Sequence, residues 1–553
     1  MRASSLLLAG FLPAVGFLLT SPAIVRGSAS RPRPTPAPRV AVSAAPLRKN
    51  TMTGITAATS QRVHPVLIRN EHNPFLRIVV NAPDDGAQVL AFRISLNGTG
   101  AVKGVDALEL FAAAEGGEFS PAAPFGLPAA GERKVEFRGT RPLRGGENVF
   151  WLSCRLKATA GLGGRVGAVC TAVETSAGTV EPLNRTPEIR HRIGVALRKH
   201  RDDGVHTYRI PTLATTAKGT LLCAYDMRRR MGRDLQEDID IGLSRSTDGG
   251  RTWEAPRIIV DMGEYGGLPQ EQNGCSDPGI VVDRKTGEIF CFAVWMWGKP
   301  GKHQWNDDGS EPGFEIGKSA QLLMVRSQDD GRTWSKPVNL TRVLKKEEWW
   351  LLAPAPNQGI QLPDGVLVMP MQGRDAHGVP FATIMHSRDH GVTWTVGNSA
   401  YRQGNECQAV QLGDGSIMLN MRNDNPDRFR AVYVTRDLGQ TWEPHVTNRS
   451  ALIEPNCNGS LYRMDYREGD EARHVLLFAN PHTQAGRTHH TIQVSDDDGR
   501  TWPEHRHLLL DEGRGAGYPS LSRVDSRHVG IVYEGSQSHL VFERFTLDEL
   551  LHR

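Results

Sequence analysis

The chain has 553 residues with a formal net charge of +4, and 39% of its residues are hydrophobic. A chain of this length exceeds a single ordinary core, so two or three domains are expected. Residues 1–49 hold seven Lys/Arg and no Asp/Glu, which leaves 58 basic against 61 acidic residues in the remainder. The remainder therefore lacks the concentrated basic face of a nucleic-acid-binding protein, and no nucleic-acid partner is expected.

The N-terminus has the pattern of a secretory signal peptide. Arg2 precedes an apolar stretch from Leu6 to Leu19, which is shorter than the roughly 18 residues of a membrane-spanning helix. We expect residues 1–30 to direct export to the periplasm or the extracellular space, without stable membrane insertion. An uncleaved anchor is the alternative. Residues 31–61 begin with a Pro/Ala/Arg-rich stretch that cannot form a core, so an extended linker is expected there.

Residues 62–182 carry short strand-like runs separated by Gly and Pro. In VFWLSCRLK, Phe150, Leu152 and Cys154 alternate with more polar neighbours, as in a strand with one buried face. This pattern predicts a β-sandwich that either binds carbohydrate or only packs against the next domain. The seven Cys residues lack close pairing motifs and several lie in apolar runs, so they are expected to be small buried hydrophobic side chains.

An eight-residue phrase recurs five times in the second half of the chain. It reads STDGGRTW at 246–253, SQDDGRTW at 327–334, SRDHGVTW at 387–394, TRDLGQTW at 435–442 and SDDDGRTW at 495–502. In each copy an Asp can bond the backbone, a Gly can take positive φ, and a Trp follows. An apolar run precedes every copy, so the phrase predicts a turn between two strands.

Six further apolar runs, beginning at residues 219, 287, 365, 415, 474 and 528, alternate with these turns. Six strands of this kind, five of them followed by the turn, predict six four-stranded blades with a degenerate last blade. The fold class is therefore all-β: a six-bladed β-propeller over 191–553, preceded by the β-sandwich. The turn phrase matches the Asp box, and its Asp and Trp residues are expected to have a structural role.

Several charged and aromatic residues stand outside this repeat. Arg209 lies in the phrase YRIP, and Asp234 follows 25 residues later; Glu406 and Arg422 are 16 residues apart. Arg487 precedes the last Asp box, and Tyr518 lies in a Gly/Pro turn. In this order the motifs resemble the sialidase (neuraminidase) family of bacterial exo-α-sialidases over residues 191–553. The preceding region resembles, more weakly, the accessory β-domain of some secreted members.

The resemblance implies a clamp of three arginines, Arg209, Arg422 and Arg487, on the carboxylate of a terminal sialic acid. Guanidinium groups suit this role because they are planar, permanently charged and bidentate. It also implies that Glu534 orients Arg209 and that Arg228 lies near Asp234 and contacts the 4-hydroxyl side of the sugar. The resemblance further implies that Asp277 and Gln358 line the pocket.

The resemblance implies Tyr518 as nucleophile, Glu406 as its base, and Asp234 as general acid and then general base. Sialidases are a known exception to the carboxylate nucleophile of retaining glycosidases. A neutral phenol avoids pushing an anion against the substrate carboxylate, but its ordinary pKa near 10 requires a base. The expected reaction is hydrolysis with net retention through a tyrosyl-sialoside intermediate.

Each role has a structural alternative: the arginines as surface residues, Tyr518 as a core aromatic, Glu406 as a loop carboxylate, and Asp238 or Asp240 in place of Asp234. Two other functions remain open. One is a non-catalytic Asp-box propeller that binds glycans; the other is a trans-sialidase, or an enzyme for a related 2-keto sugar acid.

Expected partners are sialylated glycoproteins, glycolipids or oligosaccharides. The sequence has no HExxH motif or Gly-rich phosphate loop, so no metal or other cofactor is expected, and a monomer suffices.

The trans-sialidase alternative raises the question of a site for the acceptor of the transferred sugar. Several bulky aromatics either line such a site or fill blades. They are Trp295, Trp297, Trp305, Trp349 and Trp350.

Overall fold

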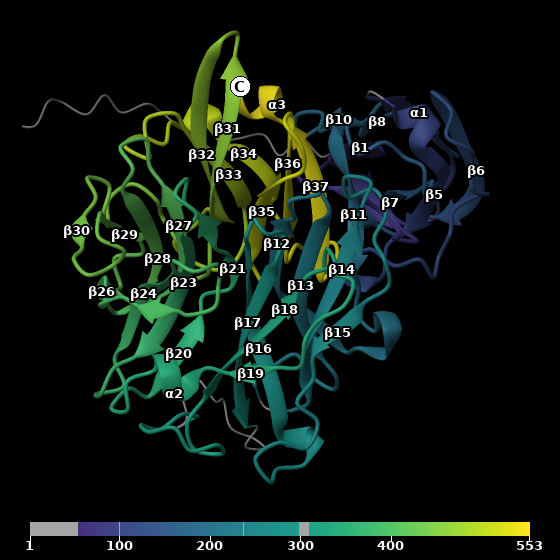
Figure 1. Ribbon diagram of the computed structural model, residues 1–553. Helices are drawn as coiled ribbons and strands as arrows, with labels where there is room; N and C mark the ends of the chain where they lie inside the picture. The colour runs from purple at the N-terminus through teal and green to yellow at the C-terminus, as the bar shows by residue number, and fades with distance from the viewer. Residues whose placement is uncertain (1–53, 99, 236, 298–308, 553) are drawn as a thin grey trace, which may run out of the picture. The chain divides into compact units, whose positions relative to one another are not determined.

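The computed structural model describes residues 54–552 except 99, 236 and 298–308, and these residues belong to one compact unit, Met52–Arg553. Strands dominate this part of the chain (Figure 1). Its α-helices are three short segments: α1 (Ala101–Gly104), α2 (Thr341–Leu344) and α3 (Leu547–Leu551). The expected signal peptide, and the expected linker up to residue 53, lie outside the described residues.

The N-terminal domain consists of two packed sheets, as the alternating strand pattern predicted. One sheet has the order β10 (Leu183–Asn184), β1 (Thr56–Ser60), β3 (Asn73–Ala82), β7 (Gly146–Leu156), β5 (Val105–Ala112). The other contains β9 (Gly178–Val180), β8 (Arg165–Thr175), β4 (Gln88–Asn97) and β6 (Lys134–Pro142). The predicted linker is wrong for residues 56–60, because these residues form β1, which pairs with β3. The sandwich therefore runs from Thr56 to Asn184.

Six antiparallel units follow, each with four strand positions; in the third unit the first and last positions are each occupied by two short strands. In the first two, the strands are β12 (Thr207–Thr215), β13 (Leu221–Arg228), β14 (Ile239–Ser246) and β15 (Arg257–Val260), then β16 (Asn273–Val282), β17 (Ile289–Trp297), β18 (Gln321–Ser327) and β19 (Val338–Asn339). The third contains β20 (Leu351–Pro354) and β22 (Ile360–Gln361) on one side of β23 (Leu367–Arg374), and β24 (Pro380–Ser387), β25 (Thr395–Val396) and β26 (Tyr401–Arg402) on the other. A short strand, β21 (Asn357–Gln358), pairs with β16.

The fourth unit is β27 (Gly404–Gln411), β28 (Ile417–Asn423), β29 (Ala431–Thr435) and β30 (Glu443–Pro444). The fifth is β31 (Ser460–Glu468), β32 (Glu471–Pro481), β33 (His490–Ser495) and β34 (Leu508–Asp511). The sixth is β35 (Pro519–Arg523), β36 (His528–Tyr533), β37 (Leu540–Thr546) and β11 (His191–Arg198). The first strand of each unit contacts that of the next, and β12 contacts β35, which closes a six-bladed propeller.

Strand β11 holds the two domains together. It is the fourth strand of the sixth blade through its pairing with β37, and it also pairs with β8 of the sandwich and β2 (Val66–Ile68). Buried residues of both domains form one hydrophobic cluster, in which Val195 and Phe542 belong to the propeller and Phe75 to the sandwich. The ends of the propeller chain are thus joined within one blade, so the blade predicted to be degenerate is complete.

The five Asp boxes connect the third and fourth strands of blades one to five. In the first, Asp248 accepts hydrogen bonds from the backbone N–H and the hydroxyl of Thr252, at 3.0 and 2.6 Å, and Trp253 donates to the carbonyl of Gly250. The other copies repeat the Asp–Thr bonds. These side chains bond within their own turns and do not line the central pocket described below.

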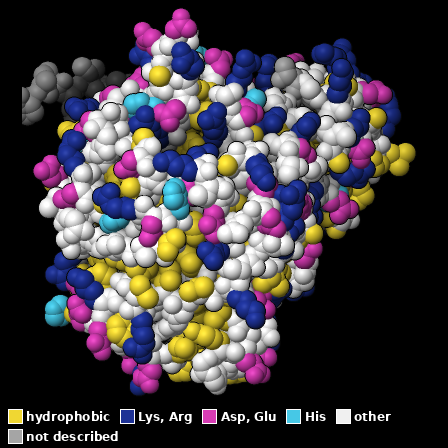
Figure 2. All heavy atoms as spheres, in the orientation of Figure 1, with side chains coloured by type: hydrophobic (Ala, Val, Ile, Leu, Met, Phe, Trp, Pro, Cys, Tyr) yellow, Lys and Arg dark blue, Asp and Glu magenta, His cyan; other side chains and the backbone are white. Residues whose placement is uncertain are grey.

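Figure 2 shows Lys/Arg and Asp/Glu side chains interspersed over the visible face, with apolar side chains gathered over the region of β20. That face has no extended area of one charge. Among the described residues, no helix is long and apolar enough to cross a membrane.

Candidate active site

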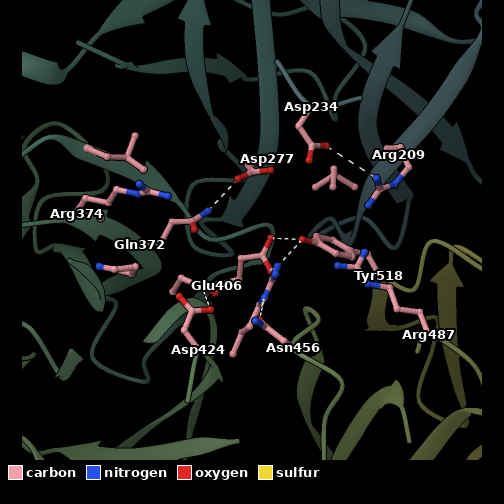
Figure 3. Close-up of a pocket in the computed structure, with 16 residues that line it drawn as sticks. Arg209, Asp234, Asp277, Gln372, Arg374, Glu406, Asp424, Asn456, Arg487 and Tyr518 are labelled. Carbon is pink, nitrogen blue, oxygen red and sulfur yellow. Dashed lines mark hydrogen bonds and ion pairs between the residues drawn. The ribbon is translucent and has the colours of Figure 1, made fainter. Parts of the chain in front are cut away.

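A pocket of about 430 Å³ lies where the first strands of the blades begin. All six blades contribute to it: Arg209, Asp234, Asp277, Leu351, Gln372, Arg374, Glu406, Arg422, Arg487 and Tyr518 are among its lining residues (Figure 3). Residues that are up to 309 positions apart, from 209 to 518, meet here only because the propeller closes.

Backbone irregularities aim three of these side chains into the pocket. The pairing register shifts between Arg209 and Thr212 in β12, between Ser276 and Gly279 in β16, and between Gly404 and Cys407 in β27. Such bulges turn a strand locally and are frequent beside active sites. They place Arg209, Asp277 and Glu406 at the mouth of otherwise regular inner strands.

Tyr518 and Glu406 are in direct contact. The Tyr518 hydroxyl donates to Glu406 Oε1 at 2.5 Å, and Arg422 Nη1 donates both to Glu406 Oε2 at 2.7 Å and to the Tyr518 oxygen at 2.9 Å. Burial and the neighbouring Glu406 carboxylate raise the pKa of Tyr518 well above its ordinary value, although Arg422 and Arg487 oppose the shift. The phenol is therefore protonated, and its proton points at a carboxylate that can accept it.

Two more guanidinium groups flank the Tyr518 ring. Arg209 and Arg487 lie 5.3 and 5.4 Å from its centroid, within the range of a cation–π interaction. Gly517, with φ +101, allows this approach, since a Cβ there would lie 2.8 Å from Arg487 Cδ. Arg209, Arg422 and Arg487 therefore converge on one end of the pocket, where they form a site for a carboxylate.

Glu534 fixes one member of this group. Its Oε1 accepts from Arg209 Nε at 2.6 Å and from the Ile210 N–H at 2.7 Å, and its Oε2 accepts from the Tyr518 N–H at 3.0 Å. The Glu534 side chain is 1% exposed. Burial acts to lower the pKa of Arg209, but the Glu534 and Asp234 carboxylates more than offset it and raise that pKa.

The Ile210 backbone shows the constraint that this contact imposes. Its φ of +55° is rare for a β-branched residue and costs of order 1–3 kcal/mol. The hydrogen bond from its N–H to Glu534 helps to hold this conformation, and thereby the direction of Arg209.

Asp234 lies across the pocket, in the loop between β13 and β14, and its side chain is 29% exposed. Its Oδ1 lies 2.6 Å from Arg228 Nη2 and 3.9 Å from Arg209 Nη1. This carboxyl is separated from the Tyr518–Glu406 pair in Figure 3, with the pocket between them. A sugar bound there would meet Asp234 on one side and Tyr518 on the other.

The family comparisons agree with this geometry. A family model described as a BNR repeat-like domain matches residues 219–531. A sialidase of Bacteroides fragilis is 42% identical over 421 residues, which is 76% of this chain and 76% of that protein. A sialidase of Micromonospora viridifaciens is 33% identical over 344 residues, which is 60% of this chain and 50% of that protein. The structure named Hadza microbial sialidase Hz136 has a TM-score of 0.82 at 36% identity and covers 89% of this chain and 99% of that one.

The chain belongs to the sialidase family. It is accordingly a glycoside hydrolase, and the fold class and family predicted from the sequence are confirmed.

The structure of this sialidase brings most predicted site residues together and corrects two. Asp277 lines the pocket, as expected, but Gln358 does not. Gln358 lies in β21 and donates to the Leu521 carbonyl at 2.6 Å, and it lines a second cavity at the other ends of the inner strands. Its prediction as a substrate-binding residue is wrong because its side chain joins two blades below the site.

Arg228 lies beside Asp234, as expected, but its side chain is 0% exposed and is not part of the pocket lining. Its predicted contact with the sugar is therefore not supported: the guanidinium supports Asp234 from behind. Asp240, the alternative to Asp234 as the acid/base residue, pairs with Arg229 and also lies outside the pocket lining.

Other pocket residues were not predicted. Gln372 donates to Asp277 Oδ2 at 2.9 Å, and Asn456 accepts from Arg422 Nε at 2.6 Å; Arg374, Asn405 and Asp424 also line the pocket. Burial and the Glu406 carboxylate raise the pKa of Asp277 well above its ordinary value. In the sequence, Gln372 ends an apolar strand run, and this polar ending was the available signal.

The remaining expectations have simple outcomes. All seven Cys residues are free and buried. The described residues contain no cluster of His, Cys, Asp and Glu suited to a metal ion. Of the aromatics considered for an acceptor site, Trp295 is 0% and Trp349 9% exposed, so both fill the core, whereas Trp297 and Trp350 are partly exposed. Trp305 lies outside the described residues.

Proposed function

We propose that this sialidase is an exo-α-sialidase that removes terminal sialic acids from glycoproteins, glycolipids or oligosaccharides with net retention. The observation that carries the mechanism is the 2.5 Å hydrogen bond from the Tyr518 hydroxyl to Glu406, beside three converging arginines. The arginines bind the substrate carboxylate and so set the anomeric carbon, to which that carboxylate is attached, next to the phenol oxygen.

In the first step, the Tyr518 oxygen attacks the anomeric carbon while its proton passes to Glu406. The bond to the leaving oxygen breaks, and Asp234 donates a proton to that oxygen, so the free alcohol departs. The tyrosyl-sialoside then remains. Arg422, which contacts both Glu406 and Tyr518, stabilises the negative charge that moves between them.

In the second step, Asp234 takes a proton from a water molecule that attacks the same carbon. The bond to the Tyr518 oxygen breaks, and that oxygen recovers its proton from Glu406. Two displacements at one centre give net retention. The polar pocket of about 430 Å³ would accommodate one terminal sugar residue, which is the reason for proposing exo action.

The test is fluorescence release from a 4-methylumbelliferyl α-sialoside by the purified protein, with proton NMR of the first-formed sugar anomer. The proposal requires release and an α product. Release with a β product would refute retention, and binding of sialic acid without release would favour a glycan-binding propeller. Transfer to added lactose in preference to water would favour a trans-sialidase.

We further propose that the protein acts as a monomer after export to the periplasm or the extracellular space. Support for export comes from the apolar stretch after Arg2. Cell fractionation with N-terminal sequencing tests export, since a processed N-terminus near residue 30 in the exported fraction is expected. Size-exclusion chromatography with light scattering tests the monomer.

A further inference from the structure

A buried carboxylate that the mechanism above does not use lies directly behind the acid/base residue. Asp226 is in β13, two residues before Arg228, and its side chain is 0% exposed. Its Oδ2 accepts from Arg228 Nη2 at 2.9 Å, from Arg228 Nε at 3.2 Å and from the Ser276 hydroxyl at 2.7 Å. Among the described residues, its Oδ1 has no hydrogen-bond partner.

Arg228 stands between two carboxylates. The same Nη2 atom lies 2.9 Å from Asp226 Oδ2 and 2.6 Å from Asp234 Oδ1, while Nη1 donates to the Gly232 carbonyl at 2.7 Å. The positive charge of one fully buried guanidinium is thus shared by a buried and a pocket-facing carboxylate.

This sharing matters because Asp234 has to hold a proton before it can act as an acid. Arg228 at 2.6 Å and Arg209 at 3.9 Å both favour the ionised form of Asp234. Glu534 already balances the charge of Arg209, but with an unbalanced Arg228 this carboxyl would be a poor proton donor at neutral pH. A counter-charge on the far side of Arg228 weakens that effect.

We propose that Asp226 is a positioning residue that balances the charge of Arg228, so that Asp234 can carry the proton it gives to the leaving group. The inference rests on the proposed function, since it concerns the acid role of Asp234. Asp226 itself does not line the pocket in which the substrate would bind.

Several charged groups face the Arg228–Asp234 pair. Arg209 comes from β12, Arg228 from β13 itself, and Asp277 from β16; Glu406 lies across the pocket. Burial raises the pKa of Asp226 to about 6, although Arg228 opposes that shift. Asp226 is therefore half ionised near pH 6 and supplies nearly all of its counter-charge from about pH 7 upward.

The experiment is the pH dependence of kcat/KM for sialyllactose, measured for the parent and for Asp226→Asn. The substitution removes the counter-charge and keeps the side-chain shape. We expect the alkaline limb to move down by about one pH unit or more, in the range that a nearby charge produces. At pH values above both limbs, a shift of one pH unit amounts to roughly a tenfold loss of kcat/KM.

The leaving group supplies a second readout. A 4-methylumbelliferyl group departs as a stable anion and needs less help from an acid than a sugar alcohol does. Asp226→Asn should therefore affect sialyllactose several-fold more than the fluorogenic substrate. A merely structural defect would reduce both to the same extent.

Asp240→Asn is the matched control. Asp240 is also buried, is paired with Arg229, and has a pKa raised to about 6 by burial, but neither Asp240 nor Arg229 lines the pocket. Its substitution should leave the alkaline limb in place. Ser276→Ala serves if Asp226→Asn does not fold, because loss of the hydroxyl donor to Asp226 should shift the limb in the same direction by a smaller amount.

An unchanged limb and equal losses on both substrates would overturn the inference. An equal shift in Asp240→Asn would overturn it as well. Failure of the proposed function is distinguishable, because then the parent would release no sialic acid, or Asp234→Ala would show no greater loss with sialyllactose than with the fluorogenic substrate.

Discussion

Glu534→Gln tests how strongly the carboxylate clamp depends on a residue that does not contact the substrate. The change keeps the side-chain shape but removes the charge and one acceptor atom. Glu534 accepts three hydrogen bonds, from Arg209 Nε, the Ile210 N–H and the Tyr518 N–H. A glutamine has one acceptor oxygen, so it cannot satisfy donors on both sides, and an NH₂ group must face an N–H.

Two effects follow. Removing one partner of a buried ion pair costs about 3–5 kcal/mol of folding stability. Release of Arg209 from its fixed direction removes a charge-assisted bond to the substrate carboxylate, worth about 1.5–3 kcal/mol, which is roughly a 10- to 150-fold loss of kcat/KM.

Glu543→Gln is the control for the first effect alone. Glu543 is also 1% exposed, pairs with Arg192 at 3.0 Å and accepts from the Tyr533 hydroxyl at 2.9 Å, but it lies in β37 away from the pocket. The assay is thermal melting with steady-state kinetics at a temperature where every variant is folded. Both variants should melt earlier, and only Glu534→Gln should lose kcat/KM. A Glu534→Gln variant with kcat/KM within twofold of the parent would refute the orienting role.

Tyr518→Phe should abolish most turnover but retain binding of a dehydrated sialic acid analogue, and near-normal turnover would show that the phenol is not the nucleophile. Arg487→Ala should weaken binding of that analogue by about tenfold or more in isothermal titration, since it removes one guanidinium from the clamp. An unchanged affinity would exclude Arg487 as a carboxylate ligand. Gln358→Ala should leave KM unchanged, whereas Gln372→Ala should raise it, because only Gln372 lines the pocket; steady-state kinetics with sialyllactose distinguishes them, and the reverse pattern would contradict the site. Burial lowers the pKa of His191 to about 3, so the unfolded chain alone binds this proton below about pH 6.5 and the parent loses stability on acidification. The melting temperature of His191→Gln relative to the parent should therefore rise from pH 7 to pH 4, and a constant difference would refute the burial of a neutral His191.

Much of the site was predictable because its residues lie in short, distinctive phrases. Arg209 in YRIP, Glu406 and Arg422 in neighbouring strands, and Tyr518 in a Gly/Pro turn were all assigned from the sequence, and the fold brings them into one pocket. The propeller itself was predicted by the repeated Asp box, since a turn that recurs between apolar strands implies repeated antiparallel units.

What the sequence could not supply was the direction of individual side chains. Gln358 and Gln372 are both polar residues near inner strands, and only the three-dimensional pairing shows which faces the pocket. Arg228 was correctly placed beside Asp234, but its complete burial depends on Asp226 and Ser276, which come from two different strands. The role of β11 was likewise hidden, because its partner β37 lies more than 340 residues later in the chain.

The most direct test of the central claim is to trap the intermediate. The protein would be incubated with 2,3-difluorosialic acid, whose fluorine at C3 slows both displacements while the fluoride at C2 departs, and the adduct would be mapped by peptide mass spectrometry. The account predicts time-dependent inactivation with the sugar attached to Tyr518, and protection by a competitive sialic acid analogue. Attachment to Asp234 or Glu406 instead, or full hydrolysis of sialosides without any covalent adduct, would contradict it.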